Sequence, residues 1–319
     1  MLTAVPGPVL TPVKADGDNA AAMNPGLLYA LLAFGTWGLF PLYLRLVASV
    51  PPLELVAHRS TWSLLFLLGV LALLRRWAWL AELWRQPRQV LLFAATALLL
   101  SVNWLVYVYA VAAGQVLEAS LGYFINPLVS VLLAVLVLRE RLRPPQWLAV
   151  ALAAAGVLWL TLQAGRLPWV ALALAVSFGI YGLLRKTARL GALEGLTLET
   201  LLLAPLVLPL LAWLTLQPGG AMARGDMALN GLLWLSGPLT ALPLLCFALA
   251  ARRLPLVTIG LLQYLSPTLQ FLLGLWVFHE PLQPARLVGF VFIWAGLAVY
   301  SGHAWWTARR LAAAVARTA

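Results

Sequence analysis

Charged residues are scarce in this chain of 319 residues, at 10%, whereas soluble domains average about 25%. Hydrophobic residues make up 63% of the chain, which is more apolar surface than a water-soluble fold buries. The charges favour one sign, with 21 Lys and Arg against 10 Asp and Glu. A basic excess also fits a nucleic-acid-binding protein, but these charges lie in short clusters between apolar runs. Composition therefore predicts an all-α polytopic membrane protein whose partner is the lipid bilayer, with no nucleic acid.

Residues that bind metals or activate nucleophiles are equally rare. The single cysteine, Cys246, excludes an intrachain disulfide and a cysteine-based metal site. The histidines, His58, His279 and His303, show no ligand spacing. No glycine-rich phosphate loop opens a helix, which argues against ATP as an energy source. We therefore expect no enzyme, with no catalytic residues, metal or cofactor. We expect any energy coupling to come from an ion gradient, such as that of the proton, or from the gradient of the substrate itself.

Residues 1–24 lack the apolar core of a secretory signal peptide. They contain Pro, Gly and Asp, and we expect a disordered cytoplasmic tail. Met23 offers a second candidate for the initiator methionine.

Long apolar runs fill the rest of the chain. A spanning helix needs about 20 apolar residues, and Pro, Gly and Arg clusters separate ten such runs. A basic cytoplasmic tail, 307–319, follows the last of them. The predicted spans are 26–48, 53–74, 89–111, 116–138, 145–163, 167–186, 196–216, 228–250, 255–278 and 284–306.

The Lys and Arg residues between spans predict the orientation. With the N-terminus inside, inner segments carry sixteen and outer loops carry four, Arg45, Arg166, Arg224 and Arg286. Both termini are therefore predicted to be cytoplasmic. The inner segment 75–88, RRWAWLAELWRQPR, has three tryptophans among arginines and predicts a helix at the headgroup level.

The two halves of the chain resemble each other. LGYFINPLVSVLLAVLVLRERLRPPQW from Leu121 aligns with LLQYLSPTLQFLLGLWVFHEPLQPARL from Leu261 at a constant offset of 140. The identities include prolines, a glutamate and, further on, a glycine, which apolar composition does not explain. The starts of the halves align more weakly at offset 141. The most informative identities are Pro127/Pro267, Glu140/Glu280, Pro144/Pro284 and Gly156/Gly296.

Each half holds five predicted spans, so the second half enters the membrane from the opposite side, as an inverted repeat. We place the first repeat at 25–163 and the second at 164–306. The inner loop RERLRP corresponds to the outer loop HEPLQP, in which each arginine has been replaced. This loss of positive charge is expected of a copy that faces outward.

Polar residues inside spans are costly and tend to face a cavity. Substrate sites of inverted-repeat transporters lie near the midplane, at broken helices, and Pro127 and Pro267 are placed for that role, although a structural kink is an alternative. Glu118 also fits a solvated helix end, and Asn103 an interhelical hydrogen bond. The candidate cavity residues are His58, Arg59, Asn103, Trp104, Tyr107, Glu118, Tyr123, Asn126, Pro127, Tyr181, Glu199, Gln263, Tyr264 and Pro267.

Arg59 is the one basic residue that the loop count assigns to neither side. At 1.5 Å per residue it lies about 9 Å below Leu53. It could extend to the interface, pair with an acid such as Glu54 or Glu118, or face a cavity, which we favour. At offset 140 it falls opposite Glu199. This suggests that the two opposite charges guard the outer and inner approaches.

Several stretches resemble one known family. They are MNPGLLYALLAFGTWGLFPLYLRL, ELVAHRSTWSLLF, LTLETLLLAP and, most specifically, LEASLGYFINPL. Over residues 23 to about 300 the chain is similar to RarD-type members of the EamA transporters, in the drug/metabolite transporter superfamily. The resemblance implies an inner-membrane permease with ten spans in two EamA repeats. The family's description as chloramphenicol-sensitive proteins implies a drug link, and its relatives imply metabolite export.

We therefore predict a secondary transporter that exports a small amphipathic metabolite or drug by alternating access between the repeats. A passive channel of the same fold is one alternative. A membrane enzyme acting on a lipid-linked substrate is another, although it would need an acid or metal cluster that the sequence does not show.

Overall fold

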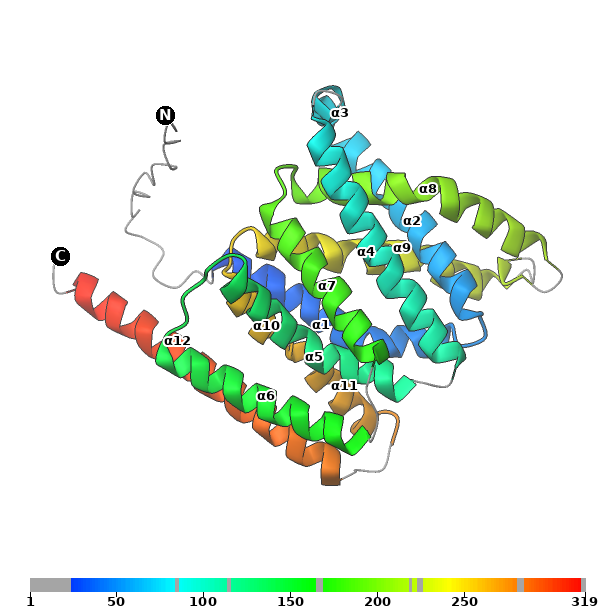
Figure 1. The fold of residues 1–319 in the computed structure, drawn as a ribbon. Helices are drawn as coiled ribbons and strands as arrows, with labels where there is room; N and C mark the ends of the chain where they lie inside the picture. The colour runs from blue at the N-terminus through cyan, green and yellow to red at the C-terminus, as the bar shows by residue number, and fades with distance from the viewer. Residues whose placement is uncertain are drawn as a thin grey trace.

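The computed structural model describes residues 24–83, 86–113, 116–164, 169–217, 220–222, 226–279 and 284–316. Apart from short connections, these residues form helices (Figure 1). The predicted N-terminal tail and Glu280 lie outside the described residues. The helices are α1 (Pro25–Leu46), α2 (Pro52–Leu73), α3 (Ala78–Leu83), α4 (Pro87–Ala112), α5 (Val116–Leu136), α6 (Pro144–Ala164), α7 (Trp169–Thr187), α8 (Ala192–Leu216), α9 (Met227–Ala251), α10 (Leu256–Leu262), α11 (Leu265–Trp276) and α12 (Pro284–Ala316).

The predicted all-helical membrane fold is confirmed. Within the described residues nine segments are long and apolar enough to cross a membrane, and residues 121–136 of α5 form a shorter apolar helix. Five of the long helices, α1, α2, α4, α6 and α12, begin at a proline, where the missing backbone N–H costs no intrahelical hydrogen bond. The same prolines mark the boundaries in the sequence, which is why the predicted spans lie close to the helices.

The ninth predicted span consists of two helices, α10 and α11, which meet at Gln263 and Tyr264. Pro267 is the third residue of α11, where its ring displaces no intrahelical donor. The predicted break at Pro127 is absent, because α5 continues through this residue. A membrane helix tolerates an internal proline where neighbours pack closely, and a Cβ on Gly260 of α10 would lie 2.9 Å from the Pro127 carbonyl oxygen.

Helix packing reflects the repeat. The repeat makes α1 equivalent to α7, α2 to α8, α4 to α9, α5 to the α10–α11 pair, and α6 to α12. The contact of α2 with α9 therefore corresponds to that of α8 with α4, and the contact of α1 with α9 to that of α7 with α4. The contact of α5 with α7 corresponds to that of α1 with α10 and α11. The pairs α2–α8, α5–α10 and α6–α12 map onto themselves. The contacts among the described helices therefore match between the two halves of the chain, as an inverted repeat with a pseudo-twofold axis predicts.

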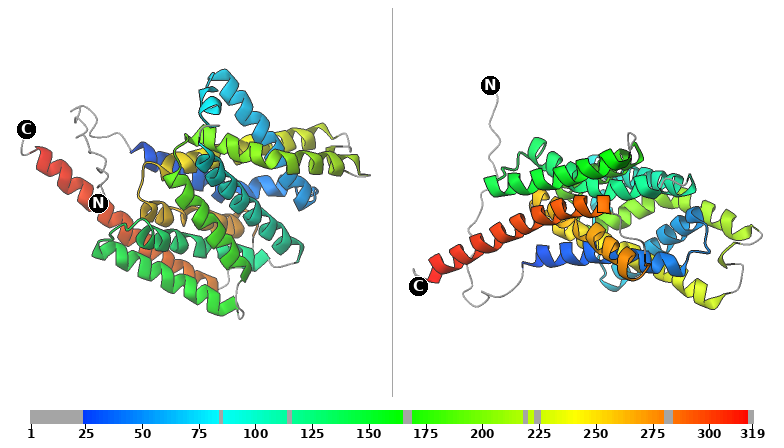
Figure 2. Two further views of the ribbon diagram at one scale, coloured as in Figure 1. Left: turned by 45° about the horizontal axis from the view of Figure 1, so that its top comes forward. Right: turned by 90° about the horizontal axis from the view of Figure 1, so that it is seen from below.

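Helices α6 and α12 lie side by side along one edge (Figures 1 and 2). Equivalent glycines allow their backbones to approach. A Cβ on Gly156 would lie 2.5 Å from the Gly289 carbonyl oxygen, and one on Gly296 would lie 2.7 Å from the Ala149 carbonyl oxygen. The final turns of α12 extend beyond the bundle, on the side where α1 begins (Figure 1).

The short helix α3 lies within the arginine- and tryptophan-rich segment 75–88, at one end of the bundle (Figure 1). Trp79 is buried against Leu71, Phe93 and Leu198, whereas Trp77 is exposed. One tryptophan thus packs on protein rather than facing headgroups, which the sequence pattern did not predict.

Candidate functional site

A cavity of about 450 Å³ lies between the two halves. Its wall is formed by α1, α2, α4 and α5 of the first half and by α7, α9 and α11 of the second. At one end the wall includes the connection between α1 and α2, where Ala48 and Pro52 are exposed. The cavity therefore reaches the surface at the end of the molecule that carries this connection. We call this the open end and the opposite one the closed end.

Eight of the predicted site residues line this cavity. The lining set is Arg59, Asn103, Trp104, Tyr107, Tyr123, Asn126, Gln263 and Pro267. His58, Pro127, Tyr181, Glu199 and Tyr264 lie elsewhere, and the Glu118 side chain is outside the described residues. The lining residues come from four regions of the chain, which the repeat brings together at one place.

Arg59 projects from α2 into the cavity wall. Its Nε donates a hydrogen bond of 2.9 Å to the Thr240 hydroxyl oxygen of α9. Its guanidinium carbon lies 4.8 Å from the ring centre of Phe40 and 5.7 Å from that of Trp104. No described Asp or Glu side chain lies within 4 Å of it. Aromatic faces and a hydroxyl hold this cation, and no described carboxylate neutralises it.

Amide side chains add polarity to the wall. Asn103 donates to the Leu174 carbonyl oxygen and to the Ser177 hydroxyl, both at 2.9 Å, so it joins α4 to α7 as an interhelical hydrogen bond. The Gln263 side-chain oxygen accepts a hydrogen bond from Ser130. The Asn126 side-chain oxygen is buried and has no described hydrogen-bond partner.

Equivalent residues of both halves line part of the cavity, which places this part where the two halves meet. Four pairs are related by the offset of 140, and Trp37 and Phe178 by the offset of 141. The other lining residues near the open end belong mainly to the first half. The four pairs are Leu100/Thr240, Trp104/Leu244, Tyr123/Gln263 and Asn126/Ser266.

Aromatic rings separate the cavity from the closed end. Phe34, Trp37 and Phe178 line the cavity, and Phe247 contacts all three with ring centres 5.3 to 6.2 Å apart. Tyr181 stacks on Phe247 with ring centres 6.1 Å apart. Interlocked aromatic rings are well packed, and here they form the floor of the cavity.

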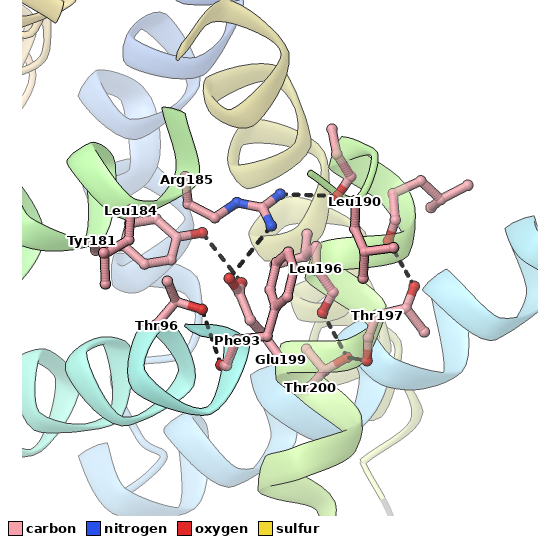
Figure 3. Close-up of polar contacts among 12 residues, drawn as sticks. Phe93, Thr96, Tyr181, Leu184, Arg185, Leu190, Leu196, Thr197, Glu199 and Thr200 are labelled. Carbon is pink, nitrogen blue, oxygen red and sulfur yellow. Dashed lines mark hydrogen bonds and ion pairs between the residues drawn. The ribbon is translucent and has the colours of Figure 1, made fainter. Parts of the chain in front are cut away.

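Below this floor lies a buried ion pair (Figure 3). Arg185 of α7 and Glu199 of α8 approach to 3.5 Å, with both side chains almost fully buried. The Tyr181 hydroxyl donates to the other Glu199 oxygen at 3.4 Å, and Arg185 donates to the Ala192 carbonyl oxygen at 3.0 Å. The Phe93 ring centre lies 5.4 Å from the Arg185 guanidinium carbon. Unlike its equivalent Arg59, Glu199 therefore has a partner of opposite charge.

Glu140 and Lys186 close the same end. The Glu140 carboxylate accepts hydrogen bonds from the backbone N–H groups of Leu256 and Val257, at 2.8 and 3.1 Å, so it caps the start of α10. Lys186 lies 3.8 Å from Glu140 and donates to the Leu254 carbonyl oxygen at 2.6 Å. These contacts join the connection between α5 and α6, in the first repeat, to α7 and α10 of the second. We call Glu140, Tyr181, Arg185, Lys186 and Glu199 the closed-end cluster.

His58 points away from the cavity. It is fully buried on α2, 3.8 Å from the Glu54 carboxylate, and its Nδ1 accepts a hydrogen bond from the Trp62 indole N–H. Glu54 itself accepts a hydrogen bond of 2.7 Å from the Ala221 backbone N–H. Arg59 does not pair with Glu54, because this carboxylate serves the connection between α8 and α9.

Sequence reasoning missed several residues that the structure brings to the site. Thr240 and Ser266 line the cavity, but single hydroxyls in apolar runs resemble ordinary helix residues. Arg185 and Lys186 entered the sequence prediction only as positive charges that mark the cytoplasmic end of a span. The repeat offered one signal for Thr240, because its equivalent at offset 140, Leu100, lies about one helical turn before the candidate residue Asn103.

A helical membrane bundle whose two halves make matching contacts around a cavity is typical of membrane transporters built from inverted repeats. The EamA-like transporter family matches residues 24–162. An uncharacterized transporter of Pseudomonas aeruginosa is 47% identical over 91% of this chain and 98% of its own length. Protein RarD of Streptomyces exfoliatus is 46% identical over 93% of each chain, and protein RarD of Escherichia coli 41% over 92% and 99%.

The chain belongs to the RarD group of the EamA transporters, within the drug/metabolite transporter superfamily. A solved crystal structure of a protein that is 22% identical matches 91% of this chain and 99% of its own, with a TM-score of 0.67. That likeness shows the fold alone. The predicted family is confirmed, and the chain is a multi-pass membrane transporter.

Proposed function

We propose that this transporter carries a small amphipathic metabolite or drug across the bacterial inner membrane by alternating access, most simply as an exporter. One observation carries the proposal: the cavity between the two halves is open at one end and closed at the other by an aromatic floor and the closed-end cluster. Exchanging the conformations of repeats 25–163 and 164–306 would close the open end and open the closed end.

The positive charges favour an orientation for this state. The closed end carries Arg76, Lys186 and Arg252, and such residues concentrate on the cytoplasmic side. We infer that both termini are cytoplasmic and that the open end faces outward. A proton is the simplest coupling ion, because Glu199 offers a buried carboxylate whose protonation would release Arg185.

The test is solute counterflow in proteoliposomes that contain the purified full-length chain. A relative that is 34% identical is named chloramphenicol-sensitive protein RarD, from Pseudomonas aeruginosa, so chloramphenicol belongs in the panel beside amphipathic metabolites. Alternating access predicts saturable uptake that preloaded solute accelerates. Linear uptake without counterflow would favour a channel, and no uptake of any panel solute above protein-free liposomes would contradict the proposal.

A further inference from the structure

The cavity holds one strong electrostatic feature, the cation of Arg59. Arg59 is half-buried on the wall, and no described lining residue is an Asp or a Glu. A buried charge without a counter-charge is costly unless something else compensates it. In the empty state the compensation comes from two aromatic faces and the Thr240 hydroxyl.

The geometry leaves one edge of the guanidinium for a ligand. Nε is used by Thr240, and Phe40 and Trp104 lie close to the group. The Arg59 Nη atoms donate no hydrogen bond to any described residue. A planar guanidinium that is held in this way favours a planar anion that accepts two parallel hydrogen bonds, which describes a carboxylate.

The other lining residues indicate what kind of ligand body the cavity can hold. Phe34, Trp37 and Phe178 offer an aromatic surface against which an apolar or aromatic body can pack. The volume of about 450 Å³ suits a small organic molecule. A primary ammonium group would need an acid for compensation, and the described wall supplies none.

We propose that Arg59 makes this cavity selective for amphipathic monocarboxylates, which carry an apolar or aromatic body and one carboxylate and lack an ammonium group. The inference rests on the proposed function, because it names the substrate class of the same cavity. It ranks ligands of one shape by charge: the anion binds best, the neutral amide and the zwitterion bind more weakly, and the cation binds worst.

Equilibrium binding to the purified full-length protein tests this ranking. The probes are 3-phenylpropionate, 3-phenylpropionamide, phenylalanine and 3-phenylpropylamine, which share one body. Ligand-induced shifts in thermal unfolding give the apparent affinities up to millimolar concentration. We expect 3-phenylpropionate to bind at least about tenfold more tightly than the amide, since a hydrogen bond to a charged group is worth more than a neutral one. The amine should produce no shift.

Arg59→Gln should abolish the preference for the acid over the amide. The matched control is Arg253→Gln, because Arg253 also lies over an aromatic ring, that of Tyr29 at 5.1 Å, but is exposed at the closed end. It removes the same charge and should keep the preference. Thr240→Val should weaken binding of the acid without removing the cation, which keeps the test valid if Arg59→Gln does not fold.

Equal binding of acid and amide, tightest binding by the amine or by phenylalanine, an unchanged preference in Arg59→Gln, or no binding by any of the four would each overturn the inference. Counterflow separates it from the proposed function. If 3-phenylpropionate binds through Arg59 but shows no carrier-mediated flux, the substrate class of the cavity stands and alternating-access transport of it does not. If other solutes show counterflow while the acid does not bind, the proposed function stands and the monocarboxylate inference fails.

Discussion

Arg59 and Glu199 occupy equivalent positions in α2 and α8, yet their surroundings differ. Arg59 faces the cavity and has no described acidic partner, whereas Glu199 is fully buried and pairs with Arg185. The difference follows from where the two positions lie, because Arg59 lines the cavity and Glu199 is buried at the closed end. A cation exposed to the cavity is free for a ligand, and a buried carboxylate needs an internal partner.

The buried pair predicts a stability effect. Glu199→Gln leaves the Arg185 cation buried without its partner, and removing one partner of such a pair costs roughly 3–5 kcal/mol. We expect thermal unfolding in detergent to shift down by several degrees. The double substitution Arg185→Gln with Glu199→Gln removes both charges and should recover most of the loss. Additive losses in the double variant would show that the two residues do not act as a pair.

Sequence reasoning reached part of the site at this scale. Arg59, Asn103, Tyr123 and Asn126 were predictable, because polar residues inside apolar spans tend to face a cavity. The place of Tyr181 and Glu199 below the aromatic floor was not. Which end of the cavity is closed depends on the tertiary packing of the helices, which the sequence pattern does not contain.

At the scale of helices, the close crossing of α6 and α12 depends on glycine. A methyl group on Gly156 would lie 2.5 Å from the Gly289 carbonyl oxygen, and overpacking typically costs about 1–3 kcal/mol. Gly156→Ala should therefore lower the unfolding temperature. Gly69→Ala is the matched control, because a Cβ there meets nothing within 4 Å, and its unfolding temperature should be unchanged or slightly higher. Equal changes in unfolding temperature for the two substitutions would contradict the close contact of α6 with α12 at Gly156.

The start of α10 depends on a residue that is distant in sequence. The Glu140 carboxylate accepts hydrogen bonds from the backbone N–H groups of Leu256 and Val257. The loss of such a cap lowers helix stability by about 1 kcal/mol. We expect Glu140→Ala to accelerate amide hydrogen exchange in the first turn of α10, roughly fivefold for that energy. Exchange in α6 serves as the internal reference and should not change. Unchanged exchange in α10 would show that the carboxylate does not stabilise this helix end.

The helices themselves were largely predictable, and their interruptions were not. Prolines mark both the starts of the runs and the starts of the helices, so the boundaries could be read from local chemistry. Pro127 and Pro267 are equivalent in sequence, but only the second lies next to a break. Whether a proline interrupts a helix depends on the packing of its neighbours, which a local pattern does not contain.

At the scale of the whole molecule, the repeat relates residues at the open end to equivalent residues at the closed end. Val56 lines the cavity near its open end and is half-buried. Its equivalent at offset 140, Leu196, is 1% exposed. If the repeats exchange conformations, the two positions exchange accessibility, so Val56 should be reached from outside and Leu196 from the cytoplasm.

Cysteine labelling tests this exchange in intact cells and inside-out vesicles. The background is Cys246→Ser, which removes the single native thiol. Val56→Cys should react with a membrane-impermeant maleimide only from outside, and Leu196→Cys only from the cytoplasmic side and more slowly, because the described state closes that end. A transported solute should change both rates in opposite directions, since each carrier opens to one side at a time. Simultaneous labelling of both positions at rates that do not respond to solute would identify a channel, and the reverse sidedness would invert the orientation inferred from the charges.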